Sequence, residues 1–162
     1  MRDGARVTIR PLTPADAALY PDFFAHVTAD DLRLRFFAPI ATLTPEMIAH
    51  FTHYDPAKAM AFIAIGGNGE MLGVARLHDD PDGKGGEFAV LVRSSLKGHG
   101  LGWLLMQHII DYARRKGLAS VHGEVLSENL TMLQMCRELG FGIADDAGEA
   151  GVKRATLKLG LA

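Results

Sequence analysis

The residues best suited to chemistry form a glycine-rich segment in the second half of the chain, Lys97-Gly98-His99-Gly100-Leu101-Gly102. Glycines at alternate positions leave backbone N–H groups unobstructed, and the start of a predicted helix adds a partial positive charge. These features predict a cradle for phosphate groups. The segment is neither a GxGxxG dinucleotide fingerprint, because Trp103 and Leu105 stand where the third glycine would be, nor a Gly-Lys-Ser/Thr loop. The alternative is a glycine-rich turn that binds no ligand.

Two polar residues lie at the ends of elements near this loop. Glu87 begins an otherwise apolar strand, Phe88 to Val92, that leads to the glycines, so its carboxylate is expected near whatever the loop binds. Asn129 opens a predicted helix further along the chain. The structural alternatives are an exposed charge at a strand end for Glu87 and an ordinary helix N-cap for Asn129.

The composition of the 162-residue chain limits its class and its partners. The length and a hydrophobic content of 48% predict one globular domain, residues 1–162, with Met1 to Ala5 as a flexible tail. The formal net charge of -2 argues against nucleic-acid binding. Apolar runs such as Met60 to Ile65 are too short to cross a membrane. A single cysteine, Cys136, allows no internal disulfide, so we expect a cytoplasmic protein.

The first third of the chain predicts a strand followed by short helices. Val7 to Arg10 alternates apolar and polar residues like a strand. Helix start signals, in which a threonine precedes proline or stands three residues before an acid, occur at Thr13, Thr28 and Thr44. Two or three short helices are therefore expected within residues 14–54.

The remainder predicts a sheet whose strands are first antiparallel and then connected through helices. Three strand-like segments separated by turn sequences predict a meander: Met60 to Ile65, Met71 to Leu77 and Glu87 to Arg93. Helices and strands then alternate and suggest crossover connections: a helix from Gly98 to about Lys116, a strand Leu118 to Leu126, a helix Asn129 to Leu139 and a final strand Val152 to Leu159. The predicted fold class is α/β (α+β), a single mixed, mostly antiparallel sheet flanked by helices.

The chain resembles the GCN5-related N-acetyltransferase (GNAT) superfamily, and more narrowly the acetyltransferase domain of bacterial Pat-type protein lysine acetyltransferases. The superfamily resemblance is carried by Glu87 to Val92, Lys97 to Gly102, Val125 to Asn129 and Leu139-Gly140-Phe141. The narrower one is carried by Ile9 to Leu12, Leu34 to Phe37 and Gly73 to Arg76, so the resemblance covers nearly the whole chain. It implies the GNAT fold, with an acetyl-CoA cleft between the strands Glu87 to Arg93 and Leu118 to Leu126.

The resemblance also implies a reaction and its residues. An amine would attack acetyl-CoA directly, and Glu87 would be the general base that accepts the proton of an amine whose pKa is ordinarily near 10.4. A backbone N–H near Leu91 or Val92 would stabilise the oxyanion. Residues implied in binding the pantetheine arm and the pyrophosphate are Val90, Leu91, Val92, Lys97, Gly98, His99, Gly100, Leu101, Gly102 and Asn129. No metal is implied.

Two residues depart from the family pattern. Lys97 replaces the usual Gln or Arg at the start of the loop, which keeps a cation but not a planar fork. Cys136 stands where many GNAT enzymes have a tyrosine that protonates the leaving thiolate. The thiol is a weak candidate for that acid, and the alternative places Cys136 in the core, because its helical neighbours are Met132, Leu133 and Met135.

Other residues offer alternatives. Glu124, which shares a strand face with His122, competes with Glu87 for the role of base. A pair of arginines and a pair of phenylalanines, Arg33, Arg35, Phe36 and Phe37, either shape the acceptor wall or form an amphipathic helix. His50 and His53 are three residues apart on a predicted helix, but no third metal ligand is evident.

Three functions are compatible with the sequence. The first is acetylation of a protein lysine, with an acyl-CoA synthetase as the substrate that the resemblance suggests. The second is acetylation of a small amine. The third is a CoA-binding sensor without turnover, which Cys136 in place of tyrosine favours and the intact Glu87 and glycine loop oppose. Neither nucleic acid nor a membrane is an expected partner.

Overall fold

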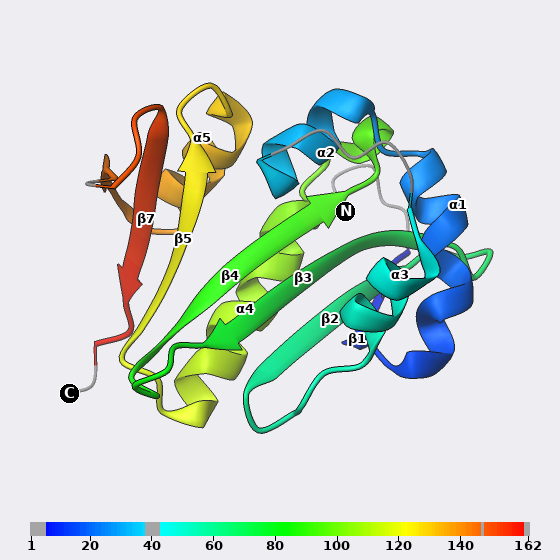
Figure 1. Ribbon diagram of the computed structural model, residues 1–162, viewed down its shortest axis with the longest axis horizontal. Helices are drawn as coiled ribbons and strands as arrows, with labels where there is room; N and C mark the ends of the chain where they lie inside the picture. Colours follow the sequence, from blue (N-terminus) through cyan, green and yellow to red (C-terminus); the bar gives the residue numbers. More distant parts are fainter. Residues whose placement is uncertain (1–5, 38–42, 147, 161–162) are drawn as a thin grey trace.

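One seven-stranded sheet organises the described part of the chain (Figure 1). The computed structural model describes residues 6–37, 43–146 and 148–160, and the predicted tail Met1 to Ala5 lies outside them. The strand order is β1-β2-β3-β4-β5-β7-β6. The strands are β1 Thr8–Pro11, β2 Ala59–Ile65, β3 Met71–Asp79, β4 Gly85–Val92, β5 Ser120–Leu126, β6 Gly142–Asp145 and β7 Val152–Lys158.

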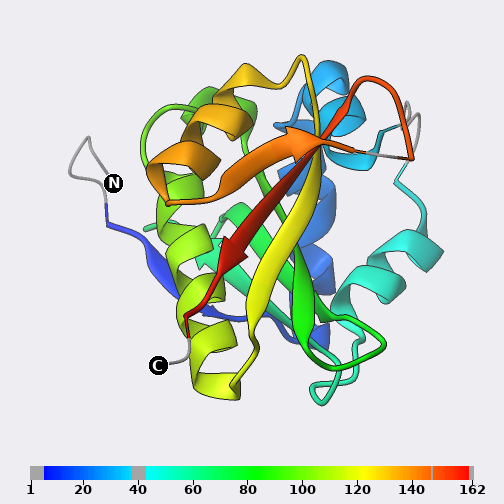
Figure 2. The same ribbon diagram turned by 90° about the vertical axis from the view of Figure 1, so that its left-hand side faces the viewer.

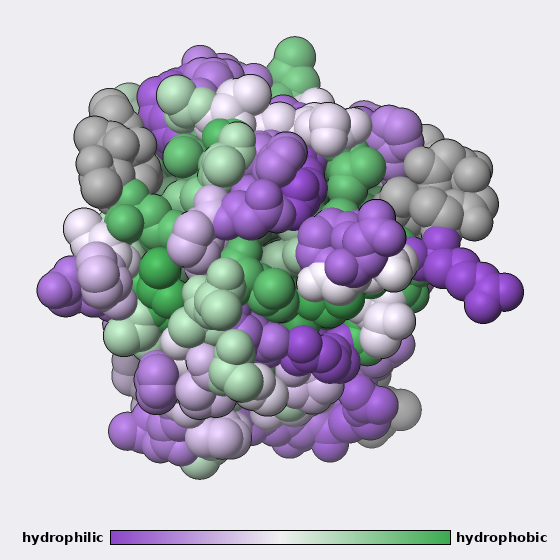
Figure 3. All heavy atoms as spheres, turned by 90° about the vertical axis from the view of Figure 1, so that its right-hand side faces the viewer, coloured by the Kyte–Doolittle hydropathy of each residue, from purple (hydrophilic) through white to green (hydrophobic). Residues whose placement is uncertain are grey.

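Helices cover both faces of the sheet. The α-helices are α1 Tyr20–Ala25, α2 Ala29–Phe36, α3 Pro45–Thr52, α4 Leu101–Lys116 and α5 Leu130–Glu138, and 3-10 helices span Pro14–Leu19 and Ser94–Leu96. Figure 2 shows α4 and α5 on one face and α1, α2 and α3 on the other. Each face has its own hydrophobic core, the first around Leu105 and Ile109 and the second around Tyr20 and Phe23. On the outer side of α1 and α3, hydrophilic side chains interrupt the hydrophobic ones, as expected for amphipathic helices (Figure 3).

The predicted helix starts are confirmed by their capping contacts. The Thr28 hydroxyl accepts a hydrogen bond from the Asp31 amide, and Thr44 does the same for the amide of Met47. At Thr13 the backbone amide donates to the carboxylate of Asp16, but the helix that follows is a 3-10 helix. These local contacts explain why threonine spacing located the helices correctly.

The structure corrects the sequence prediction at one helix boundary and adds one strand. The helix expected from Gly98 begins at Leu101, because Gly98 and Gly100 have φ angles of 82° and 88°, which an α-helix does not accommodate. Strand β6 was not predicted, since it has four residues, mostly exposed, and no apolar alternation. The chain therefore crosses from β5 through α5 to β6, and β7 returns between them, antiparallel to both. The second predicted crossover ends on β6, not on the final strand.

Candidate active site

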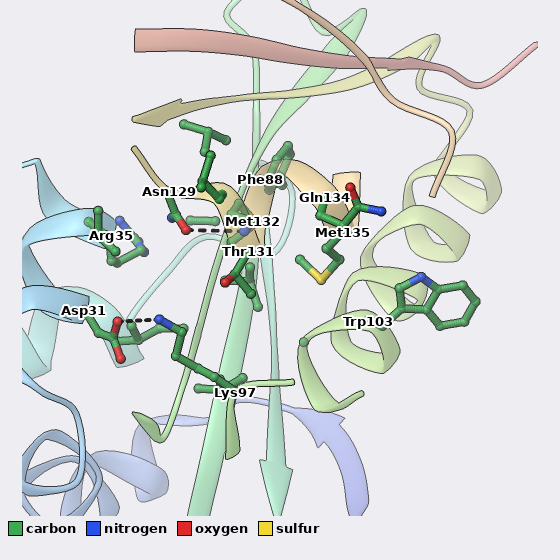
Figure 4. Close-up of a pocket in the computed structure, with 18 of the residues that line it drawn as sticks. Asp31, Arg35, Phe88, Lys97, Trp103, Asn129, Thr131, Met132, Gln134 and Met135 are labelled. Atoms are coloured by element: carbon green, nitrogen blue, oxygen red, sulfur yellow. Dashed lines mark hydrogen bonds and ion pairs between the residues drawn. The ribbon is translucent and has the colours of Figure 1, made fainter. Parts of the chain in front are cut away.

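A cleft opens where β4 and β5 separate. In the described sheet these two strands pair in parallel at three positions, the last of which joins Glu87 to His122. Beyond that point β4 continues to Val92 and β5 to Leu126, each paired on its other side. The space between them is a cavity of about 740 Å³. Its walls come from α2, β4, the glycine loop, β5 and α5 (Figure 4).

Phe88 lies where the strands diverge. A Cβ atom on Gly123 of β5 would be 2.6 Å from Cε1 of Phe88, so the ring fills the space beside this glycine. The ring also meets Phe141 edge-to-face, with the centroids 5.3 Å apart. A large ring on β4 facing a glycine on β5 prevents a closer approach of the strands at this level. We infer that Phe88 and Gly123 form the closed end of the cleft.

The free side of β4 offers backbone hydrogen-bonding groups. The Arg93 amide donates to Leu72 of β3 at 2.9 Å, and the antiparallel register then alternates along the strand. In such a ladder every second residue turns its N–H and C=O away from the partner strand. The backbone groups of Val90 and Val92 therefore face the cleft, whereas those of Leu91 face β3. Of the two positions expected to supply an oxyanion N–H, Val92 is correctly oriented and Leu91 is not.

The glycine loop presents amides at the start of α4. Gly98 and Gly100 adopt left-handed backbone conformations, which glycine adopts without strain. The first hydrogen bond within α4 runs from the Leu104 amide to the carbonyl of Gly100 at 3.1 Å. The amides of Leu101, Gly102 and Trp103 precede this bond and are not used by the helix. Unused amides and the positive end of the helix dipole are the features from which the sequence predicts a phosphate cradle.

Lys97 links this loop to α2. Its Nζ lies 2.7 Å from Oδ1 of Asp31, whose other oxygen accepts a hydrogen bond from Ser94. Burial acts to raise the pKa of Asp31, but the hydrogen bonds from Lys97 and Ser94 outweigh it, and the pKa lies below its usual value. On the other side of the cleft, Arg33 of α2 pairs with Glu128 at 2.6 Å. Helix α2 is therefore attached to both sides of the cleft.

Asn129 caps α5 and also lies in the cleft lining. Its side-chain oxygen accepts a hydrogen bond from the Met132 amide and caps α5, and the residue also lines the cleft (Figure 4). The cap uses the oxygen alone, so the two amide N–H donors remain for a ligand. Across the cleft, Met135 packs close to Gly102, where a Cβ would lie 3.4 Å from the Met135 sulfur. Helices α4 and α5 thus approach closely behind the glycine loop.

Glu87 is exposed to the cleft on the face of β4 that looks toward α1 to α3. Its register partners on the two neighbouring strands are both histidines, His78 and His122. Nε2 of His122 lies 2.8 Å from the carboxylate of Asp80. Glu124, the alternative base, also lines the cleft. The site therefore holds two carboxylates, of which Glu87 lies at the narrow end beside Phe88.

A carboxylate, the free edge of a strand and the glycine loop at the start of α4 line one cleft, an arrangement that suits transfer of an acyl group from a pyrophosphate-containing carrier. The profile of the family described as Acetyltransferase (GNAT) matches residues 25–141. The chain belongs to this GNAT family. It is an acetyl-CoA-dependent N-acetyltransferase, and acetyl-CoA is its acyl donor.

Relatives with known names agree with this assignment. An acetyltransferase of Pseudomonas aeruginosa is 30% identical over 142 residues, which cover 86% of this chain and 76% of the relative. An L-methionine sulfoximine/L-methionine sulfone acetyltransferase of the same species is 34% identical over 148 residues, with 86% and 80% covered. The crystal structure of the GNAT domain of S. lividans PAT has a TM-score of 0.90 and 30% identity, covering 98% of this chain and 93% of that one. The resemblance to Pat-type domains is therefore confirmed.

Most residues that the GNAT resemblance implicates line the cleft. They are Glu87, Val90, Leu91, Val92, Lys97, Gly98, Gly100, Gly102 and Asn129. The side chains of His99 and Leu101 do not line it. Leu101 is fully buried on the inner face of α4. The His99 amide donates to the carbonyl of Leu96. Leu101 can contribute only its backbone amide.

Cys136 lies in the hydrophobic core. Its side chain is fully buried with Leu105, Met106 and Phe141, and it is absent from the cleft lining. Burial raises the pKa of the thiol to about 11. A group that does not reach the cleft cannot protonate a thiolate there, so the position supports the core interpretation and not the general acid.

Several lining residues carried no recognised signal in the sequence. Asp31 was interpreted only through the helix start at Thr28, whereas its side chain holds Lys97. Trp103 of α4 and Met135 of α5 also line the cleft, and Figure 4 shows Met135 between α5 and α4 and Trp103 further out on α4. Of the proposed acceptor wall, Arg35, Phe36 and Phe37 line the cleft, but Arg33 does not. Local sequence gives no information about which distant segment closes a cleft.

The described residues contain neither a cluster of metal ligands nor a helix that could span a membrane. No group of three or more His, Cys, Asp or Glu side chains is placed to hold a metal ion. His53 instead has its Nδ1 3.1 Å from the carbonyl oxygen of Ala49. Within the same residues, no helix has the length and apolar character needed to cross a membrane.

Proposed function

We propose that this GNAT enzyme transfers the acetyl group of acetyl-CoA to the ε-amine of a lysine in a protein. The supporting observation is the likeness to the GNAT domain of S. lividans PAT, which extends over nearly the whole chain. The resemblance to Pat-type enzymes makes an acyl-CoA synthetase the first acceptor to test. The proposal includes a cytoplasmic location, with which a single buried thiol is compatible.

Acetyl-CoA would bind along the diverging edge of β4. The cleft-facing N–H and C=O of Val90 would pair with the amides of the pantetheine arm as an added strand would, which leaves the Val92 N–H for the reacting carbonyl. The loop amides and Lys97 would hold the pyrophosphate, and the side-chain amide of Asn129 would donate to the arm from the other side. This arrangement explains how a chain with a formal net charge of -2 attracts a polyanion, because the positive groups are concentrated locally.

Transfer needs a deprotonated amine and a stabilised oxyanion. A lysine amine with its ordinary pKa of about 10.4 is protonated at neutral pH, so a positioned base must accept its proton. Glu87 would take that proton, directly or through water, while the nitrogen attacks the thioester carbon. The Val92 amide would donate to the oxygen as negative charge develops. The C–S bond then breaks, the nitrogen gives its second proton to the departing thiolate directly or through water, and the products are the amide and CoA.

A second candidate is acetylation of the α-amine of a small amino acid. It is favoured by the relatives named as L-methionine sulfoximine/L-methionine sulfone acetyltransferases, one of which is 34% identical to this chain. The same donor site and the same base would serve this reaction. The two candidates differ in the acceptor alone.

The test is acceptor-dependent release of the CoA thiol. Acetyl-CoA and enzyme are mixed with an acyl-CoA synthetase, lysine peptides, free amino acids or polyamines, and mass spectrometry locates the acetyl group. The proposal expects release with protein or peptide lysine and an ε-acetylated product. Release with free amino acids alone would select the second candidate. Binding of acetyl-CoA without release in the presence of any acceptor would contradict both.

A further inference from the structure

Two arginines on the α1 to α3 side of the sheet have no carboxylate partner within the described residues. Arg76 of β3 is 7% exposed, donates to the Tyr20 hydroxyl at 2.7 Å and stacks over Phe51 at 5.0 Å. Arg35 of α2 lies 4.5 Å from the ring centroid of Phe36. Among residues 6–37, 43–146 and 148–160, neither guanidinium forms an ion pair with a carboxylate. Both positive charges are therefore held mainly by aromatic rings and a neutral hydroxyl.

Two other arginines near the cleft and the second core do have carboxylate partners. Arg33 pairs with Glu128, and Arg93 pairs with Asp22 at 2.6 Å. Burying a cation without a counter-charge is unfavourable, and two cations that repel each other add to the cost. Burial, followed by the charge of Arg76, lowers the pKa of Arg35 to about 10. The two guanidinium groups are thus close enough to interact, and an anion between them would relieve their repulsion.

The unpaired charges adjoin the reacting end of the cleft. Arg35 lines the same cavity as Glu87, and Figure 4 shows it on the α2 side of that cavity. The negative charge of Glu87 acts on Arg35 but no ion pair joins them. Arg76 is the register partner of Ala89, which also lines the cavity. An acceptor whose amine reaches Glu87 would therefore place its neighbouring groups beside Arg35.

We propose that the acceptor carries a carboxylate close to the reacting amine, and that Arg35, supported from behind by Arg76, binds this carboxylate. The inference rests on the proposed function. For a protein acceptor, the carboxylate would be an acidic side chain next to the target lysine. For a small acceptor, it would be the α-carboxylate. A guanidinium fork suits either one, because it matches the two oxygens of a carboxylate.

The experiment compares acceptors that differ only in this charge. The first pair is a lysine peptide with glutamate beside the lysine and its glutamine twin, and the second is leucine and leucinamide. The ratio of kcat/KM within each pair is measured for the wild type, for Arg35→Gln and for Arg35→Lys. Arg115→Gln, which removes the same charge from an exposed position near the end of α4, is the matched control.

The wild type and the control should favour the carboxylate member of the accepted pair by about tenfold or more, the range of a charge-assisted contact. Arg35→Gln should reduce this ratio to near one, with the larger fall in kcat/KM for the carboxylate member, and Arg35→Lys should give an intermediate ratio. A ratio near one in the wild type, or one that survives Arg35→Gln, would overturn the proposal. If only leucine and leucinamide react and leucine is preferred, the anion site stands while the protein-lysine proposal fails. If peptides react without preference, the reverse holds.

Discussion

Replacing Gly123 by alanine should compress the closed end of the cleft. The new Cβ would lie 2.6, 2.8 and 2.9 Å from three atoms of the Phe88 ring. Ordinary contact begins at 3.4 Å, so the ring or strand β5 must move by roughly 0.8 Å, and overpacking of this kind costs about 1–3 kcal/mol. For a chain of this size each kcal/mol lowers Tm by about 2–4 °C, which gives an expected loss of roughly 2–12 °C.

Thermal unfolding followed by circular dichroism measures this loss. Gly142→Ala is the matched control, because a Cβ there meets its nearest neighbour at 3.8 Å. Its Tm should change little. Phe88→Leu shortens the opposing side chain, so adding it to Gly123→Ala should recover part of the lost stability instead of adding a second penalty. An unchanged Tm for Gly123→Ala, or simple additivity in the double variant, would refute the packing inferred for Phe88 and Gly123.

Three further substitutions test other parts of the structure. Gly100 and Gly117 both have positive φ at the ends of α4, so an alanine at either position should cost about 1–2 kcal/mol of stability. Only Gly100→Ala should also weaken acetyl-CoA binding, by roughly tenfold or more, in a fluorescence titration. Equal weakening by both variants would contradict the phosphate cradle. The Arg10 guanidinium holds the pKa of the Asp16 carboxyl below its usual value. The wild type should therefore have a higher free energy of unfolding than Asp16→Asn, with the full difference above pH of about 4 and a smaller one as the pH falls further. Urea unfolding between pH 2 and 7 measures this difference, and a difference that does not change with pH would be inconsistent with the Arg10–Asp16 pair. Cys136→Ser should lower the free energy of unfolding by about 1–3 kcal/mol, because it buries a hydroxyl group in the core. The value of kcat should stay within about twofold of wild type. A large fall in kcat would support Cys136 as the general acid.

The contiguous part of the site was predictable from sequence because its chemistry depends on neighbouring residues. A carboxylate, an apolar strand and a glycine loop before a helix follow one another from Glu87 to Gly102. The strand itself begins at Gly85, so Glu87 is its third residue and not its first as predicted. Threonine caps likewise depend on contacts within three residues, and the starts at Thr28 and Thr44 were correct. The burial of Leu101 was also predictable from nearby residues, because helical spacing places it on the same face as Leu105.

The rest depends on tertiary packing that local sequence does not encode. Asp31 and Arg35 belong to a helix more than 50 residues before the strand they face, and only the attachment of α2 through Lys97 and Ser94 brings them to the cleft. The edge strand β6 has too few buried residues to produce an apolar pattern. Cys136 was placed by counting along a family motif, whereas the rotation of α5 turns its side chain into the core.

The most direct test of the catalytic proposal is the turnover of Glu87→Gln measured beside Glu124→Gln. Both changes replace a carboxylate that lines the cleft by an amide of the same shape. Acetyl-CoA affinity is measured separately through the fluorescence of Trp103, the one tryptophan of the chain, which also lines the cleft. Loss of a general base predicts that Glu87→Gln lowers kcat by about 10²-fold or more with unchanged acetyl-CoA affinity, while Glu124→Gln stays within a few-fold of wild type. Wild-type turnover in Glu87→Gln would contradict the assignment, and a large loss confined to Glu124→Gln would transfer the role of base to that residue.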